Sequence, residues 1–344
     1  MKTGLVYSPV YLKHDTGSHP ETSARLEVTV ALLEKSGLIS QLVPVPPYKA
    51  TISELALVHS KRYIMQIRKM AEDGGGWLDA DTVMSSHSYD AALYASGGVI
   101  EATRAVLEGV VESVFALIRP PGHHARRNRA QGFCLFNNLA IAAEYALVNY
   151  DLERILIVDF DVHHGNGTQD AFYDNPAVLY ISVHEGSFYP GTGGVDETGD
   201  GVGVGANINI PLPANCGDSE YLKAFEEIIV PAASRFRPEL ILVSAGYDAH
   251  WADRLAKMQV TTAGFARMMR TIKKLGEEFS KGRIVLSLEG GYNLRALSFS
   301  VKATLDVLLG NDDIEDPMGA SSVPYDAPDI IPLIDTLKEI HNLG

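Results

Sequence analysis

The sequence predicts an α/β protein whose central sheet is mainly parallel and flanked by helices. Short apolar runs typical of buried strands alternate with longer segments of helical periodicity, a pattern that indicates repeated β-α-β units. Several of these runs lead directly into ionisable residues and glycines, as at the ligand-binding edge of such sheets. With 46% hydrophobic residues, the 344-residue chain has enough apolar material for one large core.

The expected elements follow from these patterns in chain order. Apolar, β-branched runs predict strands at residues 4–7, 113–118, 155–158, 178–183, 207–210, 240–244 and 284–288. Helical periodicity predicts helices at residues 19–37, 91–111, 138–149, 221–236, 262–279 and 294–309. Pro20 is suited to open the first helix and Gly37 to end it. The spacing of Thr51 and Glu54 is that of a capping box, and the stretch 73–82, rich in glycine and acid, is expected to be a loop.

The sequence changes character beyond Gly310. Residues 311–329 are rich in Asp, Ser and Pro and predict an extended arm, and residues 331–342 predict a last helix. We therefore expect a main domain at 1–310. The remaining arm and helix, 311–344, are expected to pack on this domain or on a second subunit.

Composition narrows the classes of function. A formal net charge of −14 argues against nucleic acid as a direct ligand and suits the steering of cationic substrates. No apolar run reaches the roughly 18–20 residues of a membrane span, and the N-terminal stretch lacks the apolar core of a signal peptide. Two cysteines, Cys134 and Cys216, cannot form a disulfide framework. A cytoplasmic setting is therefore expected.

The stretch from Arg154 to Gln169 indicates a metal site. Its apolar first half is followed by Asp159, Asp161 and His163, at every second position. On an extended chain these side chains face the same way, and burying three ionisable groups together is costly unless something compensates them. A divalent metal does so, and Asp with His in an open site suits catalytic zinc.

Three further strand ends carry reactive groups that a parallel sheet would bring to the same edge. His123 and His124 are poorly suited to a purely structural role, because each imidazole has two ring nitrogens that need hydrogen-bond partners. Asp248 would supply a third metal ligand, although His250 is a rival because Asp248-x-His250 repeats the earlier Asp-x-His spacing. Tyr292 follows two glycines, which allow close approach to a ligand, although packing alone would also explain a tyrosine there.

These motifs resemble the histone deacetylase superfamily over residues 1–310. The likeness is to its class II type, to bacterial histone deacetylase-like amidohydrolases and to acetylpolyamine amidohydrolases. The matching segments are HPETSARL (19–26), RPPGHHA (119–125), GFCLFNN (132–138), DFDVHHGNGTQ (159–169), YPGTG (189–193), SAGYDAH (244–250) and LEGGYN (288–293). The resemblance implies the arginase/deacetylase fold, a single domain with a mainly parallel eight-stranded sheet, so that residues 1–310 would form a deacetylase catalytic domain.

The resemblance also implies two ion sites. Asp161, His163 and Asp248 match the zinc ligands of the family, and this ligand set does not exclude Fe²⁺ or Co²⁺. A structural monovalent cation, K⁺ or Na⁺, would be held largely by backbone oxygens. The residues that match this second site are Asp159, Asp161, His163, Ser182 and Val183.

The catalytic residues are likewise implied by the resemblance. His123 and His124 match the tandem active-site histidines, and Asp159 matches the carboxylate that orients the first of them. Tyr292 matches the catalytic tyrosine. Asn166 stands where class I members carry an aspartate, so that His124 is expected to pair with an amide.

The remaining matches concern the path of the substrate. Gly132, Phe133 and Tyr189 match the walls of a narrow acyl-lysine channel, and Arg25 matches an arginine beside the cavity for the released acid. At the rim, Asp81 aligns loosely with an aspartate that binds the substrate backbone. Leu255 ends a stretch that lacks the usual Asp-Pro, which leaves that side of the rim undefined.

The implied activity is hydrolysis of N-acyl, mainly acetyl, amides of lysine side chains. The expected partner is an acyl-lysine protein or peptide, with an acetylated polyamine as the alternative and a homo-oligomer compatible with the sequence. No direct contact with nucleic acid or membrane is expected. A manganese ureohydrolase of the arginase type would need a binuclear cluster with more Asp/His pairs. A non-catalytic acyl-lysine reader would not need Tyr292.

Overall fold

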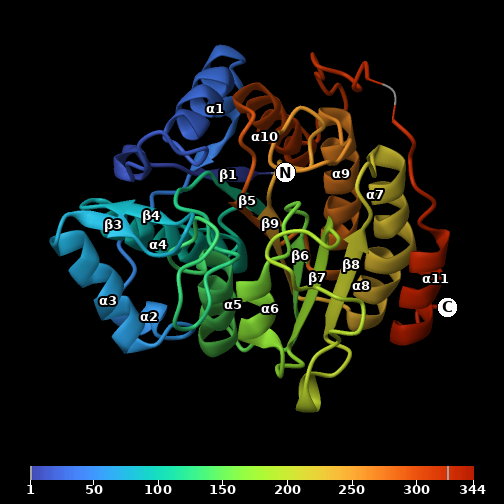
Figure 1. Cartoon of the computed structure of the whole chain (residues 1–344), viewed down its shortest axis with the longest axis horizontal. Helices are drawn as coiled ribbons and strands as arrows, with labels where there is room; N and C mark the ends of the chain where they lie inside the picture. Colours follow the sequence, from blue (N-terminus) through green and yellow to red (C-terminus); the bar gives the residue numbers. More distant parts are fainter. Residues whose placement is uncertain (1, 324) are drawn as a thin grey trace.

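A parallel sheet forms the centre of the computed structural model, which describes residues 2–323 and 325–344. Its eight strands are β1 (Thr3–Val6), β2 (Val43–Pro44), β5 (Ser113–Ala116), β6 (Ile155–Asp159), β7 (Val178–Glu185), β8 (Asn207–Leu212), β9 (Leu240–Ala245) and β10 (Ile284–Leu288). They lie in the order β2-β1-β5-β10-β9-β6-β7-β8, and all neighbouring pairs run parallel (Figure 1). The predicted fold class is confirmed.

The central strands are buried along their whole length, which explains their unbroken apolar sequences. In β6, β9 and β10 all residues are buried, because helices cover both faces of the sheet. A parallel arrangement also brings the carboxyl ends of all these strands to one edge. The loops that follow β5, β6, β9 and β10 therefore meet there.

Helices of very different length cover the sheet. They are α1 (Ala24–Lys35), α2 (Ile52–Leu55), α3 (Lys61–Glu72), α4 (Ser88–Leu107), α5 (Asn138–Asn149), α6 (Asn166–Phe172), α7 (Asp218–Ala224), α8 (Val230–Phe236), α9 (Thr262–Phe279), α10 (Leu294–Leu309) and α11 (Ile331–His341). Helices α4 and α5 pack against each other on one side of the sheet, and α1, α9 and α10 pack together on the other (Figure 1). None of the helices in the described part of the chain combines the length and hydropathy of a membrane-spanning segment.

Several boundaries differ from the sequence prediction. Helix α1 begins at Ala24, so Pro20 does not open it; Glu21, which lies between them, forms a buried ion pair with Arg119. The predicted helix at 221–236 is interrupted by a π-helical segment, Phe225–Ile229. Helix α3 and the two-residue strand β2 were not predicted, although Ser60 caps α3.

The stretch 73–82 is only partly a loop. Its residues Gly75–Trp77 form β3, which pairs antiparallel with β4 (Val83–Ser85). Residues 78–82, which join the two strands and include Asp79 and Asp81, form an acidic corner beside the site described below.

The predicted capping box is present, because Thr51 and Glu54 bond reciprocally at the start of α2.

The C-terminal arm follows the surface of the same chain. Trp251 Nε1 donates to the Gly319 carbonyl (2.7 Å), and Ala263 N–H donates to Asp316 Oδ2 (3.2 Å). Helix α11 lies at the β8 edge, where Leu337 is fully buried (Figure 1). Arg235 Nη1 donates to the His341 carbonyl (2.6 Å). In this chain the arm and helix thus have intramolecular contacts.

Candidate active site

Two carboxylates and one imidazole converge where β6 and β9 end. Donor atoms of Asp161, His163 and Asp248 all lie within 4.8 Å of one another. His163 Nδ1 is 3.2 Å from Asp161 Oδ1 and 3.1 Å from Asp248 Oδ2. The structure therefore brings together the three predicted metal ligands, which are separated by up to 87 positions in the sequence. It does not include the rival His250, whose Nδ1 accepts a hydrogen bond from Ala252 N–H (3.1 Å).

The donor set fits a divalent cation. Asp161 and Asp248 are fully buried, and among the described residues Asp248 Oδ2 makes no hydrogen bond of adequate geometry, although His163 Nδ1 lies 3.1 Å away. A buried carboxylate oxygen without a partner costs free energy, which a cation would offset. Two carboxylates and one imidazole are also a ligand combination that zinc accepts, with coordination positions left for small molecules.

Buried hydrogen bonds fix the orientation of His123. Its Nδ1 donates to Asp159 Oδ2 (3.1 Å), and the Tyr180 hydroxyl donates to the same oxygen (3.0 Å). Burial lowers the pKa of His123, but the Asp161 and Asp159 carboxylates outweigh burial and raise the pKa to about 10. His123 is therefore a charged neighbour of the predicted metal ligands, with its ring oriented by Asp159.

His124 has the opposite character. Its Nδ1 lies 2.9 Å from Asn166 Oδ1, and Asn166 Nδ2 donates to Gln131 Oε1 (3.2 Å). Because an amide oxygen only accepts, His124 carries its proton on Nδ1 and leaves Nε2 able to accept another. Burial, followed by the positive charge of His123, lowers the pKa of His124 well below its ordinary value. The ring is therefore neutral and able to act as a base.

Tyr292 stands on a loop that passes directly under the metal-ligand cluster. Gly290 N–H donates to Asp161 Oδ2 (2.7 Å), and a Cβ at Gly290 would lie 2.1 Å from Asp248 Oδ2. Only glycine permits this approach. Burial raises the pKa of Tyr292 well above its ordinary value, so that its hydroxyl keeps its proton and can donate it in a hydrogen bond.

Aromatic rings surround the cluster on the solvent side. The Phe133 and Tyr292 rings pack edge to face, with their centroids 5.6 Å apart. The Tyr189 and His124 rings also pack edge to face, with their centroids 5.3 Å apart. Gly132 has a φ of +54°, and a Cβ there would lie 2.3 Å from His124 Cδ2. Gly132 and Tyr189 thus lie against His124, and Phe133 lies against Tyr292, while the channel that they would form remains a prediction.

The two predicted rim residues lie near different aromatic residues, Asp81 near Tyr189 and Leu255 near Tyr292. The Asp81 carbonyl is 3.1 Å from His19 Nε2, and Phe133 N–H donates to Thr82 Oγ1 (3.2 Å), which joins the acidic corner to the channel wall. Burial and then the Asp81 carboxylate raise the pKa of Tyr189. Leu255 lines a cavity of about 460 Å³ together with Tyr292.

Arg25 is fully buried beneath the site. Its Nε donates to the Gly291 carbonyl (2.7 Å) and its Nη1 to Glu21 (3.0 Å), and the guanidinium lies 5.0 Å from the centre of the Tyr292 ring. Glu289, which the sequence analysis did not single out, accepts from Gly122 N–H (2.7 Å), and its other oxygen is buried with no hydrogen-bond partner in the described part of the chain. Together with His123 and Cys134 it forms a second group of buried potential ligands.

The residues predicted for a monovalent cation come from two adjacent segments: Asp159, Asp161 and His163 at and after the end of β6, and Ser182 and Val183 within β7. The strand register pairs Asp159 with Ser182, and Val183 follows. Asp161 N–H donates to Asp159 Oδ1 (3.2 Å), and His163 N–H donates to Asp161 Oδ1 (2.9 Å). Residues 159–163 are therefore held in a compact turn by their own hydrogen bonds. The K⁺ or Na⁺ ion at this site remains a prediction.

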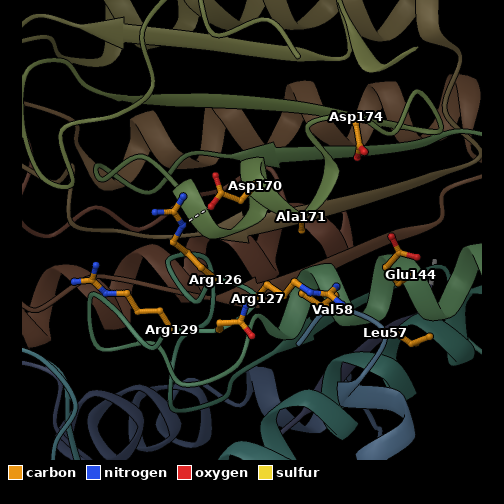
Figure 2. Close-up of a pocket in the computed structure, with 10 residues that line it drawn as sticks. Leu57, Val58, Arg126, Arg127, Arg129, Glu144, Asp170, Ala171 and Asp174 are labelled. Carbon is orange, nitrogen blue, oxygen red and sulfur yellow. Dashed lines mark hydrogen bonds and ion pairs between the residues drawn. The ribbon is translucent and has the colours of Figure 1, made fainter. Parts of the chain in front are cut away.

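A separate cavity of about 570 Å³ lies outside this site (Figure 2). The loop Arg126–Arg129 forms one wall, and Glu144, Asp170 and Asp174 of the α5 and α6 region face it. Arg126 is ion-paired with Asp170. The residues that line this cavity include none of the site residues predicted from the sequence.

The sequence analysis missed several groups that hold the site together. Tyr180, Gln131 and Glu289 each bond to a catalytic candidate or to its backbone. A signal existed for Tyr180, because it lies two positions before Ser182 on β7 and shares its face. None existed for Gln131, whose contact depends on how the loop after His124 folds back.

A parallel eight-stranded sheet with this cluster at its edge is the arginase/deacetylase fold. Residues 19–308 match the histone deacetylase domain family. Over 359 residues the chain is 42% identical to histone deacetylase 14, chloroplastic, of Arabidopsis thaliana, which covers 98% of this chain and 85% of the relative. It is 40% identical over 316 residues to a probable deacetylase of Archaeoglobus fulgidus, with 91% and 88% covered.

Solved structures agree with this assignment. The crystal structure of the HDA15 HD domain superimposes with a TM-score of 0.89 at 35% identity, and the match covers 99% of this chain and 94% of that one. The chain belongs to the histone deacetylase family. The resemblance predicted from the motifs is thereby confirmed, and membership supports a hydrolase that acts on acetylated substrates.

Proposed function

We propose that this protein is a zinc-dependent deacylase that hydrolyses acetyl-lysine side chains to lysine and acetate. The observation that carries the proposal is the convergence of Asp161, His163 and Asp248 within 4.8 Å, beside a neutral histidine and a protonated tyrosine. Family membership supports the deacetylase chemistry. The identity of the metal and of the substrate are parts of the proposal.

Asp161, His163 and Asp248 would hold the ion. A zinc ion bound there would polarise the substrate carbonyl and make a water molecule more acidic. The three ligands carry two negative charges, so that the loaded site is close to neutral. Fe²⁺ or Co²⁺ would suit the same ligands.

His124 is the proposed general base and acid. Its unprotonated Nε2 takes a proton from the attacking water and passes it to the amine nitrogen as the carbon–nitrogen bond breaks. Asn166 fixes the ring through Nδ1. His123, held by Asp159, stabilises the negative charge that develops beside it.

Tyr292 is the proposed donor to the carbonyl oxygen. As negative charge develops on that oxygen, a fixed hydroxyl stabilises it without reorganisation, which is the usual basis of oxyanion stabilisation. Phe133 and Tyr189 would enclose the aliphatic stem of lysine, while Gly132 leaves room beside His124. Arg25 is proposed to border the cavity that receives the released carboxylate.

A structural K⁺ or Na⁺ beside β6 and β7 and a cytoplasmic setting are proposed as well.

Metal removal tests the chemistry. We expect exhaustive chelation to abolish hydrolysis of an acetyl-lysine peptide and one equivalent of Zn²⁺ per chain to restore it. Elemental analysis should find one tightly held ion. Two tightly held ions would favour a binuclear site of the arginase type, and full activity after chelation would overturn the metal dependence. A chain that binds the peptide without turnover would be a reader.

The substrate class is tested at Asp81. If its carboxylate binds a peptide backbone, Asp81→Ala should lower kcat/KM for acetyl-lysine peptides much more than for acetylpolyamines, which offer no peptide amide. If it acts only as a negative charge, both classes should weaken together and added salt should reduce the deficit. A strong preference of the wild type for acetylpolyamines would replace acyl-lysine as the proposed substrate.

A further inference from the structure

Asp253 joins the loop that carries Tyr292 to the loop that follows Asp248. It is 6% exposed, and its Oδ2 accepts two hydrogen bonds, from Tyr292 N–H (2.6 Å) and Asn293 N–H (2.9 Å). Its Oδ1 accepts from Leu255 N–H (3.1 Å) in its own loop. One buried carboxylate thus links two segments that are 39 and 40 residues apart in the sequence.

The hydrogen bonds to Asp253 restrain the backbone at Tyr292 and Asn293. Tyr292 follows Gly290 and Gly291, and Gly291 has a φ of +113°, so that the loop has little intrinsic rigidity. On the N-terminal side of Tyr292, the Gly291 carbonyl accepts a hydrogen bond from Arg25 Nε. The next backbone groups, the N–H groups of Tyr292 and Asn293, both bond to Asp253.

A second contact reinforces this link. Asn293 Nδ2 donates to the Ala252 carbonyl (2.9 Å), and Asn293 Oδ1 accepts from Ala296 N–H (3.1 Å) at the start of α10. Asp253 N–H in turn donates to the His250 carbonyl (2.8 Å). The position of Tyr292 is therefore tied to a helix on one side and, through residues 248–253, to a predicted metal ligand on the other.

We infer that Asp253 is a positioning residue that holds the Tyr292 hydroxyl at the distance needed to donate to the substrate carbonyl oxygen. The inference rests on the proposed role of Tyr292. Hydrogen bonds to a carboxylate are about twice as strong as those to a neutral acceptor. A displacement of about 1 Å at a reacting group lowers a rate by about 10²-fold.

A double-mutant cycle with Tyr292→Phe tests the inference. Asp253→Ala should lower kcat on an acetyl-lysine peptide by about 10–100-fold and change KM by less than about threefold, with the metal content unchanged. In the Tyr292→Phe background the same substitution should cost less than about threefold, because the hydroxyl it positions is gone. A merely structural role would cost the same factor in both backgrounds and would overturn the inference.

Two further variants complete the experiment. Asp253→Asn keeps an oxygen that can accept both N–H groups and should recover most of the lost kcat. A folded Asp253→Asn variant that loses as much kcat as expected for alanine would overturn the inference, and this holds even if Asp253→Ala does not fold. Asp218→Ala is the matched control, because Asp218 accepts from Thr261 N–H (2.8 Å) and Oγ1 (2.7 Å) at the start of α9, away from Tyr292. Its kcat should stay near that of the wild type.

The outcomes separate this inference from the proposed function. A Tyr292→Phe variant with nearly full kcat would overturn the role of Tyr292, and the inference with it. If Tyr292→Phe clearly lowers kcat, but Asp253→Ala lowers kcat by the same factor in the wild-type and Tyr292→Phe backgrounds, the inference alone would be overturned.

Discussion

Replacing Asn166 by aspartate places a carboxylate oxygen where His124 Nδ1 now donates to an amide oxygen 2.9 Å away. A negative charge there stabilises the protonated imidazole, so the pKa of His124 should rise from its present low value. The proposed general base must be neutral to accept a proton. The limb of the pH profile that reports this base should therefore move to higher pH.

The size of the shift follows from the geometry. Two unit charges about 4 Å apart interact by about 4 kcal/mol at an effective dielectric constant of about 20, which corresponds to about three pKa units. Burial of the new carboxylate opposes its own ionisation and reduces this gain. We expect an upward shift of about 1–3 units, with Gln131 turning its amide to donate to the new oxygen.

The assay is kcat/KM for an acetyl-lysine peptide between about pH 5 and pH 10, with the metal content checked at each end. Asn149→Asp is the control, because it adds the same charge at an exposed position at the end of α5. Its profile should move by less than about 0.3 unit, since solvent and salt screen a distant surface charge. An unchanged or downward-shifted limb in Asn166→Asp would refute the contact with His124 or its role as the base.

Three other substitutions probe the scaffold. Gly132→Ala should keep the fold, measured by circular dichroism, but lower kcat/KM at least about tenfold by displacing His124; near-normal activity would show that the histidine tolerates the displacement. Glu21→Gln should lower the free energy of unfolding in urea by about 3–5 kcal/mol, because it removes the partner of two buried arginines; a loss below about 1 kcal/mol would contradict this. Leu337→Ala should cost about 2–5 kcal/mol, whereas Ile340→Ala, at a more exposed position of α11, should cost much less; equal small losses would show that α11 does not contribute to the core.

Sequence patterns determined the sheet and the chemistry at its edge. Unbroken apolar runs predicted β6, β9 and β10, because a strand covered on both faces has no polar side to present. The alternation of Asp159, Asp161 and His163 predicted a shared face, because side chains two apart on an extended chain point the same way. Both predictions depend only on residues close together in the sequence, so they can be made without knowing the fold.

The spacing of residues left Asp248 and His250 as rivals for the third ligand position, and only the family resemblance favoured Asp248; the tertiary structure shows the physical reason. Asp248 and His250 both follow β9, but Val162 N–H donates to Asp248 Oδ1 (3.0 Å), a bond across 86 residues that selects the aspartate. The bonds between Asp253 and the Tyr292 loop are of the same kind. They depend on how two loops meet after their strands end, and a pattern of neighbours along the chain carries no information about a contact between distant backbones.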